Sequence, residues 1–174
     1  MKKLIAIAGL VVSSSLLNAQ APKGFFEGYV VMNSNDTIQG YIKYKNKEEV
    51  LDKVTVIIDA ENKKTIKASE IKFFSADEEF ISYKLSGEFV FMKVLTQGYY
   101  SLYEYQLPPE KGSKYQLYYQ KENGKLQMIS ISNWKKQVED LISDNEQLVN
   151  DLKKKKYSLE TLESLFDTYN ADKE

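Results

Sequence analysis

The chain has 174 residues, with 25 acidic and 24 basic residues and a formal net charge of −1, and it contains no histidine and no cysteine. Every basic residue is lysine. The usual ligands of zinc, copper, haem and iron–sulfur clusters are therefore missing, and Ser-His-Asp and Cys-His nucleophile systems are impossible. Without arginine and with a negative net charge, the chain lacks the guanidinium groups and the basic surface that nucleic-acid binding needs. The sequence predicts no cofactor, no metal site and no nucleic-acid partner.

Residues 1–19 have the three parts of a secretory signal peptide. Lys2 and Lys3 form a positive start, an apolar stretch follows over 4–17, and the small residue Ala19 precedes the expected cleavage site. The apolar stretch is shorter than the roughly 20 residues that a membrane-spanning helix needs, so we expect no retained transmembrane segment. These features predict an exported protein, periplasmic or secreted, that begins at Gln20.

Residues 20–131 have the pattern of an antiparallel β-domain. Short runs rich in Val, Ile, Thr, Tyr and Phe are separated by short polar turns, and in 53–58 and 89–94 apolar residues recur at every second position. Gly28 and Gly40 fall inside strands, where they indicate bulges or tight bends. Pro108 and Pro109 open the longest loop between strands. Five hairpins are predicted: 26–33 with 37–45, 52–59 with 64–67, 71–75 with 80–85, 89–95 with 99–105, and 114–121 with 125–129.

Residues 132–174 change to a helical period. Trp134, Val138 and Leu141 share one face of a helix that Ser132 is placed to cap. Asp144 is the predicted cap of a second short helix, and Ser158 of a third. We therefore predict an α+β fold: an antiparallel β-meander forming a curved sheet or partly closed barrel, followed by two or three short C-terminal helices that pack on the sheet.

Tyrosine is abundant, with 13 residues, seven of them in two neighbouring predicted strands. A tyrosine surface can stack on sugar rings or anchor a protein partner, but tyrosine is also simply a good strand residue. Successive residues of a strand point to opposite faces, so at most one set of these tyrosines lines any one surface. The candidate surface-binding residues are Tyr99, Tyr103, Tyr105, Tyr115 and Tyr119.

Charged clusters give no catalytic residue. The acidic turn 77–79 and the pair Asp140 and Asp144 lack the arrangement of a paired-carboxylate hydrolase or of a calcium loop, and are interpreted as solvated acids. The lysine run 153–156 is interpreted as a helix C-terminus, with an anionic headgroup or acidic glycan as the alternative ligand.

Several motifs resemble those of uncharacterised exported proteins common in Bacteroidetes. The resemblance rests on 28–31 with the Asp-Thr-Ile-x-Gly hairpin at 36–40, on 70–74, on 93–98 leading to 102–103, and on the terminal segment from Tyr157 to Asn170. It covers nearly the whole mature chain. It implies an envelope or secreted location and transfers no catalytic residue.

The function expected from the sequence is a non-enzymatic binding or structural module of the cell envelope, with an envelope protein or a surface glycan as partner. One alternative is a carrier that holds a lipid or small hydrophobic ligand in a barrel-like cavity. The second alternative is a glycan hydrolase that uses carboxylates alone. The sequence does not indicate the oligomeric state.

Overall fold

The computed structural model describes residues 21–44, 52–59, 61–107, 115–122 and 124–173. The predicted signal peptide and the proline loop lie outside these residues. None of the helices in the described part of the chain has the length and apolar character of a membrane span.

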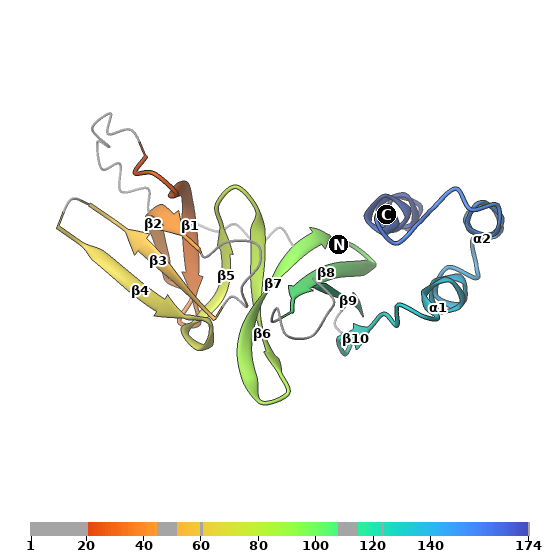
Figure 1. Cartoon of the computed structure of the whole chain (residues 1–174), viewed down its shortest axis with the longest axis horizontal. Coiled ribbons are helices and arrows are strands. Elements are labelled where there is room, and N and C mark those ends of the chain that lie inside the picture. Colours follow the sequence, from red (N-terminus) through yellow and green to blue (C-terminus); the bar gives the residue numbers. More distant parts are fainter. Residues whose placement is uncertain (1–20, 45–51, 60, 108–114, 123, 174) are drawn as a thin grey trace, which may run out of the picture.

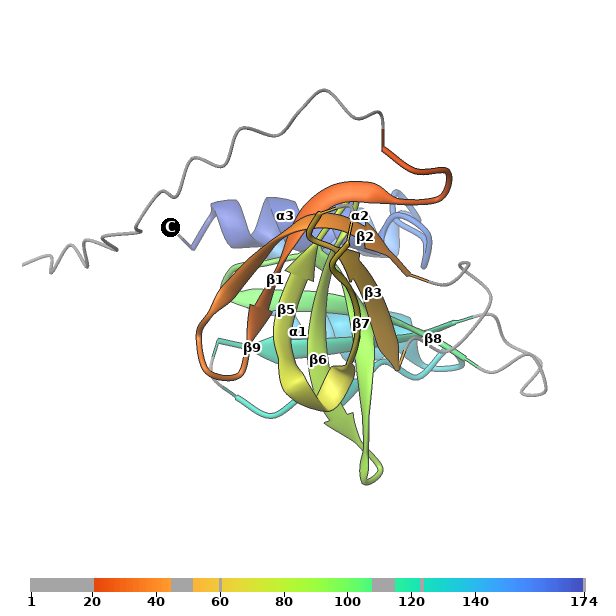
Figure 2. The same cartoon turned by 90° about the vertical axis from the view of Figure 1, so that its left-hand side faces the viewer.

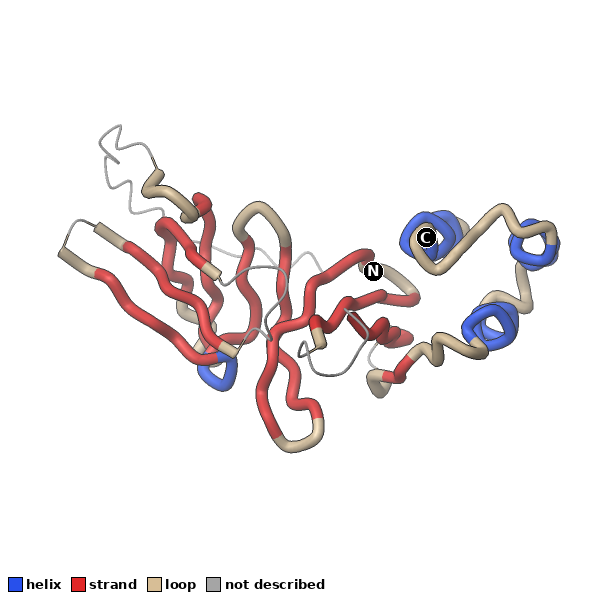
Figure 3. The backbone as a smooth tube through the Cα atoms, in the orientation of Figure 1, coloured by secondary structure: helices blue, strands red, loops and turns tan. Residues whose placement is uncertain are grey.

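The protein is an open ten-stranded antiparallel sheet followed by three short helices (Figure 1), so the predicted fold class is confirmed. The helices gather at one end of the molecule, away from the first four strands (Figure 3). The elements are β1 (Phe26–Met32), β2 (Thr37–Lys43), β3 (Lys53–Ile57), β4 (Lys63–Lys67), the 3₁₀ turn η1 (Ala68–Glu70), β5 (Ile71–Ser75), β6 (Glu79–Leu85), β7 (Glu88–Thr96), β8 (Tyr100–Gln106), β9 (Tyr115–Lys121), β10 (Gln127–Met128), α1 (Trp134–Leu141), α2 (Glu146–Lys153) and α3 (Leu162–Ala171).

The order of strands departs from a simple meander at one place. The sheet runs β10-β9-β8-β7-β6-β5-β1-β2-β3-β4, so β5 pairs with β1 and does not pair with β4, which precedes it in the chain. The four N-terminal strands therefore attach to the meander β5–β10 through β1. Strand β4 becomes an edge of the sheet.

Strands β1 to β7 and the turn η1 share one core, which we call the N-terminal core. This N-terminal core is filled by side chains that contact one another, with Phe74 stacked on Phe80 at 4.6 Å and edge-on to Phe91 at 4.9 Å between ring centroids. Its buried members are Val30, Ile42, Val54, Val56, Ile66, Ala68, Ile71, Phe74, Phe80 and Phe91.

Gly28 and Gly40, where the sequence predicts bulges or tight bends, allow the neighbouring backbone to approach closely, and the β1–β2 register runs through both without a shift. They lie directly opposite each other in the β1–β2 pair. A Cβ atom on Gly28 would lie 2.0 Å from the carbonyl oxygen of Ser75, and one on Gly40 would lie 2.3 Å from that of Ile57. Any larger residue at either position would displace the neighbouring backbone.

The sheet changes direction at strand β7. The β7–β8 register shifts between Val94 and Thr96, the mark of a β-bulge, and bulges bend the strand that carries them. Beyond it, β8 and β9 run across the direction of β5 and β6 (Figure 2). The helices cover one face of β8 and β9, and the side chains between them form what we call the helix-side core. Its buried members are Tyr100, Leu102, Leu117, Tyr119, Ile129, Val138, Ile142, Leu148, Leu152, Leu162, Leu165, Phe166 and Tyr169.

The three helices form where the sequence predicts them, but their caps differ. Helix α1 starts after Asn133 without a side-chain cap, so the predicted capping role of Ser132 is wrong. Asn145 caps α2 by accepting a hydrogen bond from the Leu148 backbone N–H, while Asp144 instead binds side chains of the C-terminal segment. The N-cap of α3 is Thr161, not Ser158. At α1 and α2 the cap is the residue after the predicted one, and at α3 it lies three residues further along the chain.

Candidate functional site

The structure separates the five tyrosines selected from the sequence. Tyr103 and Tyr105 lie on the sheet face that points away from the helices. Tyr119 is buried in the helix-side core, and Tyr99 and Tyr115 pack against that core. The five residues therefore form no single surface.

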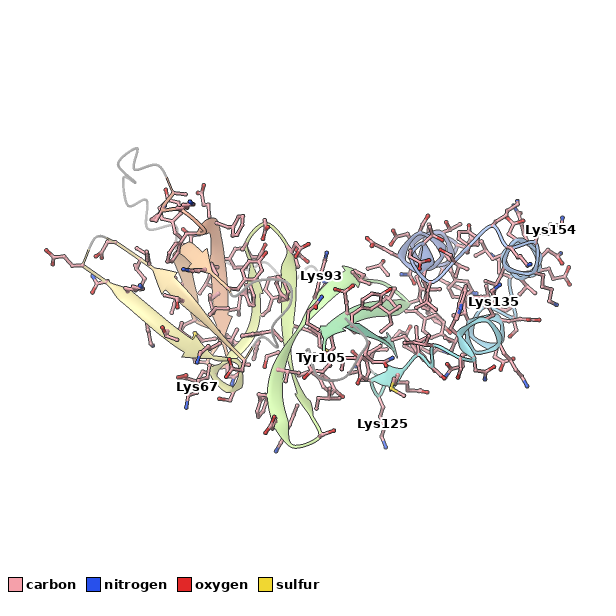
Figure 4. All side chains as sticks on the ribbon, in the orientation of Figure 1. Lys67, Lys93, Tyr105, Lys125, Lys135 and Lys154 are labelled. Carbon is pink, nitrogen blue, oxygen red and sulfur yellow. The ribbon has the colours of Figure 1, made fainter. Side chains whose placement is uncertain are left out.

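Tyr103 and Tyr105 belong to a separate apolar cluster, which we call the aromatic corner. It lies where the β6–β7 hairpin meets β8 and β9, and Figure 4 labels Tyr105 near the middle of the molecule. Its three buried residues are Val90, Met92 and Tyr103, and the half-buried residues around them are Ile81, Tyr83, Leu85, Val94, Tyr105, Tyr118 and Leu126.

The alternation of side chains along each strand produces this corner. Val90, Met92 and Val94 are the even-numbered residues of β7, while Phe91 points to the opposite face and enters the N-terminal core. Tyr103 of β8 lies directly opposite Tyr118 of β9. The alternation in 89–94 is visible in the sequence, but the meeting of β7 with β8 and β9 depends on the bend of the sheet.

The corner has an apolar centre and polar groups at its border. Burial raises the pKa of Tyr105, with a further contribution from the charge of Glu88, and burial also raises the pKa of Tyr118. Both hydroxyls therefore stay protonated at neutral pH and can donate hydrogen bonds. The Tyr103 hydroxyl lies 3.4 Å from Oε1 of Gln120. Tyrosine, methionine and aliphatic side chains within a polar rim are the composition of a protein interface.

The opposite face of the same strands is held by helix α3. Asn170, itself buried, accepts a hydrogen bond from the Tyr100 N–H at 2.9 Å and donates to the Tyr100 carbonyl at 2.8 Å. A Cβ atom on Gly98 would lie 2.6 Å from Cγ of Asn170, so this turn needs glycine. Gly98 and Asn170 both fall in motifs that carry the Bacteroidetes resemblance, and both have structural roles.

Tyr99 lies at the border of the helix-side core in a group of aromatic and cationic residues. The Lys121 ammonium lies 4.7 Å from the centre of its ring, and Lys173 lies 5.8 Å from it. A hydrogen bond to Tyr99 raises the pKa of Lys121. These contacts tie the C-terminal segment to the β7–β8 turn.

The acidic turn 77–79 is tied to neighbouring elements by its side chains. The Tyr44 hydroxyl donates to Asp77, and burial together with this hydrogen bond raises the pKa of Tyr44. Glu78 forms an ion pair with Lys93 at 2.6 Å, and Gln97 lies 3.5 Å from Glu79. A shallow depression of about 500 Å³ lies beside them, lined by Glu78, Glu79, Lys93, Val94, Leu95, Thr96 and Gln97.

The two acids predicted near the helices have different surroundings. Asp140 lies exposed on α1. Asp144 accepts hydrogen bonds from Lys173 and, at 2.7 Å, from the Tyr169 hydroxyl, and these bonds lower the pKa of Asp144. In the lysine run, Lys153 pairs with Glu139 at 2.8 Å and Lys156 with Asp151 at 2.7 Å.

A second depression, of about 270 Å³, lies over the glycine pair of β1 and β2. Two tyrosines line it, and the side chains of Glu27, Gln39 and Ser75 can hydrogen-bond a sugar. The lining residues are Glu27, Gly28, Tyr29, Gln39, Gly40, Tyr41, Ser75 and Ala76. The sequence singled out Gly28 and Gly40 here, but neither tyrosine. Within the described ranges, no group of three or more acids is close enough to hold a metal ion.

No protein-family model, curated protein or solved structure matches this chain. The Bacteroidetes resemblance therefore stays a prediction.

Proposed function

We propose that this protein is a non-enzymatic binding module that acts outside the cytoplasm, and that it contacts an envelope protein through the aromatic corner. The observation that carries the proposal is that half-buried tyrosines surround three buried apolar residues on the sheet face opposite the helices. The export signal in the sequence supports the location.

The chemistry of the corner favours a protein segment with an apolar or aromatic anchor. Tyr83, Tyr105 and Tyr118 keep part of their rings accessible while their positions are held by the sheet. Rigid aromatic side chains lose little conformational entropy on binding and are the residues most often found at the energetic centre of protein interfaces. The polar border at Glu88 and Gln120 supplies hydrogen bonds that fix the orientation of a partner.

The test is capture of a partner from native envelope by immobilised chain that starts at Gln20. Three forms are compared: wild type, the double variant Tyr105→Ser with Tyr118→Ser, and the control Tyr29→Ser, which removes an accessible tyrosine from β1. We expect wild type and the control to retain the same protein. The purified partner should bind the double variant at least about 30-fold more weakly, because single interface tyrosines commonly contribute about 2 kcal/mol or more.

Four outcomes would contradict the proposal. Equal binding by the double variant would remove the corner from the interface. Recovery of lipid alone would favour the carrier. Glycan hydrolysis that disappears when Glu78 or Glu79 is replaced by Gln would favour an enzyme, and glycan binding that needs Tyr29 would favour the depression on β1 and β2.

A further inference from the structure

The outer face of strands β2, β3 and β4 carries four lysines and no carboxylate. Lys43 pairs with Thr55, which pairs in turn with Thr65, and Lys53 pairs with Lys67. These cross-strand pairs place the residues on one face, opposite the N-terminal core. The hydroxyl oxygens of Thr55 and Thr65 lie 3.2 Å apart, within hydrogen-bonding distance, which agrees with that placement. We call this surface the lysine face; its residues are Thr37, Gln39, Tyr41, Lys43, Lys53, Thr55, Ile57, Lys63, Thr65 and Lys67.

The four lysines of this face are exposed, and within the described residues none of them forms an ion pair. At the helical end, Lys153 and Lys156 pair with acids, while Lys135, Lys136, Lys154 and Lys155 form no ion pair within the described residues. Figure 4 places Lys67 at the end of the molecule away from the helices. Asp59 in the β3–β4 turn and Glu27 of β1, opposite Tyr41, bring carboxylates to the border of this face.

Protection of a sheet edge accounts for only part of this arrangement. Strand β4 is an edge strand, and lysines on edge strands prevent pairing with other chains. Lys43 and Lys53, however, lie on inner strands. Lys53 also lies directly opposite Lys67, and like charges in that position destabilise a sheet. Edge protection therefore does not account for these two lysines, although the Lys43 ammonium also lies 5.7 Å from the centre of the Phe25 ring. Binding of an anionic partner accounts for all four.

We propose that the lysine face binds an anionic lipid surface. Its charges spread in two directions: neighbouring strands lie about 4.8 Å apart, and Lys63 and Lys67 lie four residues apart, roughly 13 Å along one strand. An array of point charges spread over three strands matches a sheet of headgroups better than it matches a single linear polymer. Ile57 is the aliphatic residue among those of β3 on this face, and it is placed to contact the apolar part of the lipid interface.

The attraction is local, because the whole chain has a net charge of −1. The contributions of clustered lysines to the free energy of membrane binding are additive and are screened by salt. Each lysine raises the partition coefficient by a factor of about five at low ionic strength. The inference involves a different surface from the aromatic corner, so it stands or falls separately from the proposed function.

The experiment is co-sedimentation of the chain from Gln20 onward, which contains every described residue, with lipid vesicles. We expect binding to vesicles that contain phosphatidylglycerol, weak binding to phosphatidylcholine alone, and loss of binding at high salt. The quadruple variant of Lys43, Lys53, Lys63 and Lys67 to Gln should lower the partition coefficient by about six-hundredfold at low ionic strength.

The matched control replaces Lys135, Lys136, Lys154 and Lys155 by Gln, which makes the same change in net charge at the exposed helical end. It should bind vesicles as the wild type does. Circular dichroism checks that both variants are folded. Equal loss in the two variants, or no wild-type binding to anionic vesicles, would overturn the proposal. Tighter binding to soluble alginate than to vesicles, with competition between the two, would overturn it in favour of an acidic polysaccharide.

Discussion

Strands β8 and β9 carry tyrosines on both faces, and the two faces have different surroundings. On one face Tyr100 and Tyr119 are buried beneath the C-terminal helices, where Tyr100 contacts Phe166 edge-on at 5.9 Å between ring centroids. On the other face Tyr105 and Tyr118 stay half-buried. The same residue type thus stabilises the fold on one side and leaves contact area on the other. The difference is made by what covers each face, since the strand pattern is the same.

The largest difference between the two faces should be seen when a buried ring is removed. Phe166→Ala leaves a cavity in the helix-side core, where Phe166 is completely buried, and should lower the free energy of unfolding by about 3–5 kcal/mol. Urea unfolding followed by circular dichroism measures it. A cost below about 1 kcal/mol would mean that α3 does not seal this face.

The clamp between Asn170 and the β7–β8 turn should have the next largest effect. Asn170→Ala leaves the buried Tyr100 N–H and carbonyl without their side-chain partner, and should cost about 1–3 kcal/mol. Gly98→Ala should destabilise the protein too, because its Cβ would overlap Asn170. The Asn170→Ala/Gly98→Ala double variant should lose less than the sum of the single losses, since the two closest overlaps, with Cγ and Nδ2 of Asn170, are removed. Strict additivity in thermal unfolding would contradict the clamp.

The aromatic corner should tolerate substitution better than the helix-covered face. Tyr105→Ser and Tyr118→Ser each remove a ring that is already partly exposed, and each should cost at most about 1.5 kcal/mol. Comparison with Phe166→Ala under identical conditions checks this. A loss as large as that of Phe166→Ala would mean that the corner is a structural core, and the proposed interface would then lie elsewhere.

The smallest effect should be a pH dependence at the helical end. Lys173 and Tyr169 lower the pKa of Asp144 in the folded protein. The unfolded chain therefore binds more protons there, so the stabilisation is present above the ordinary aspartate pKa and is lost as pH falls through the folded value. Asp144→Asn should flatten the stability profile slightly in the acidic range. An unchanged profile between the two proteins would show that this carboxylate is not linked to folding.

Many local features could be predicted from the sequence because they depend on neighbours along the chain. Alternation in 53–58 and 89–94 predicts β3 and β7, and the helical spacing of Trp134, Val138 and Leu141 predicts α1. The cap residues were predicted wrongly for all three helices, because Ser132 and Asp144 are each followed by an asparagine that suits a cap equally well, and Ser158 is followed three residues later by Thr161. The candidate tyrosines lie on two different faces of the sheet. The sequence could predict only which tyrosines of one strand share a face, because side chains alternate along a strand.

The sequence by itself determined the strand and helix content, the antiparallel pairing of hairpins and the apolar side of each strand. All of these follow from local propensity and from periodicity within a few residues. Only the tertiary structure decided that β5 pairs with β1, that the helices cover one face of β8 and β9, and that four lysines from three strands share a surface. These arrangements depend on contacts between distant segments, where several pairings satisfy the same local pattern and total burial selects one of them.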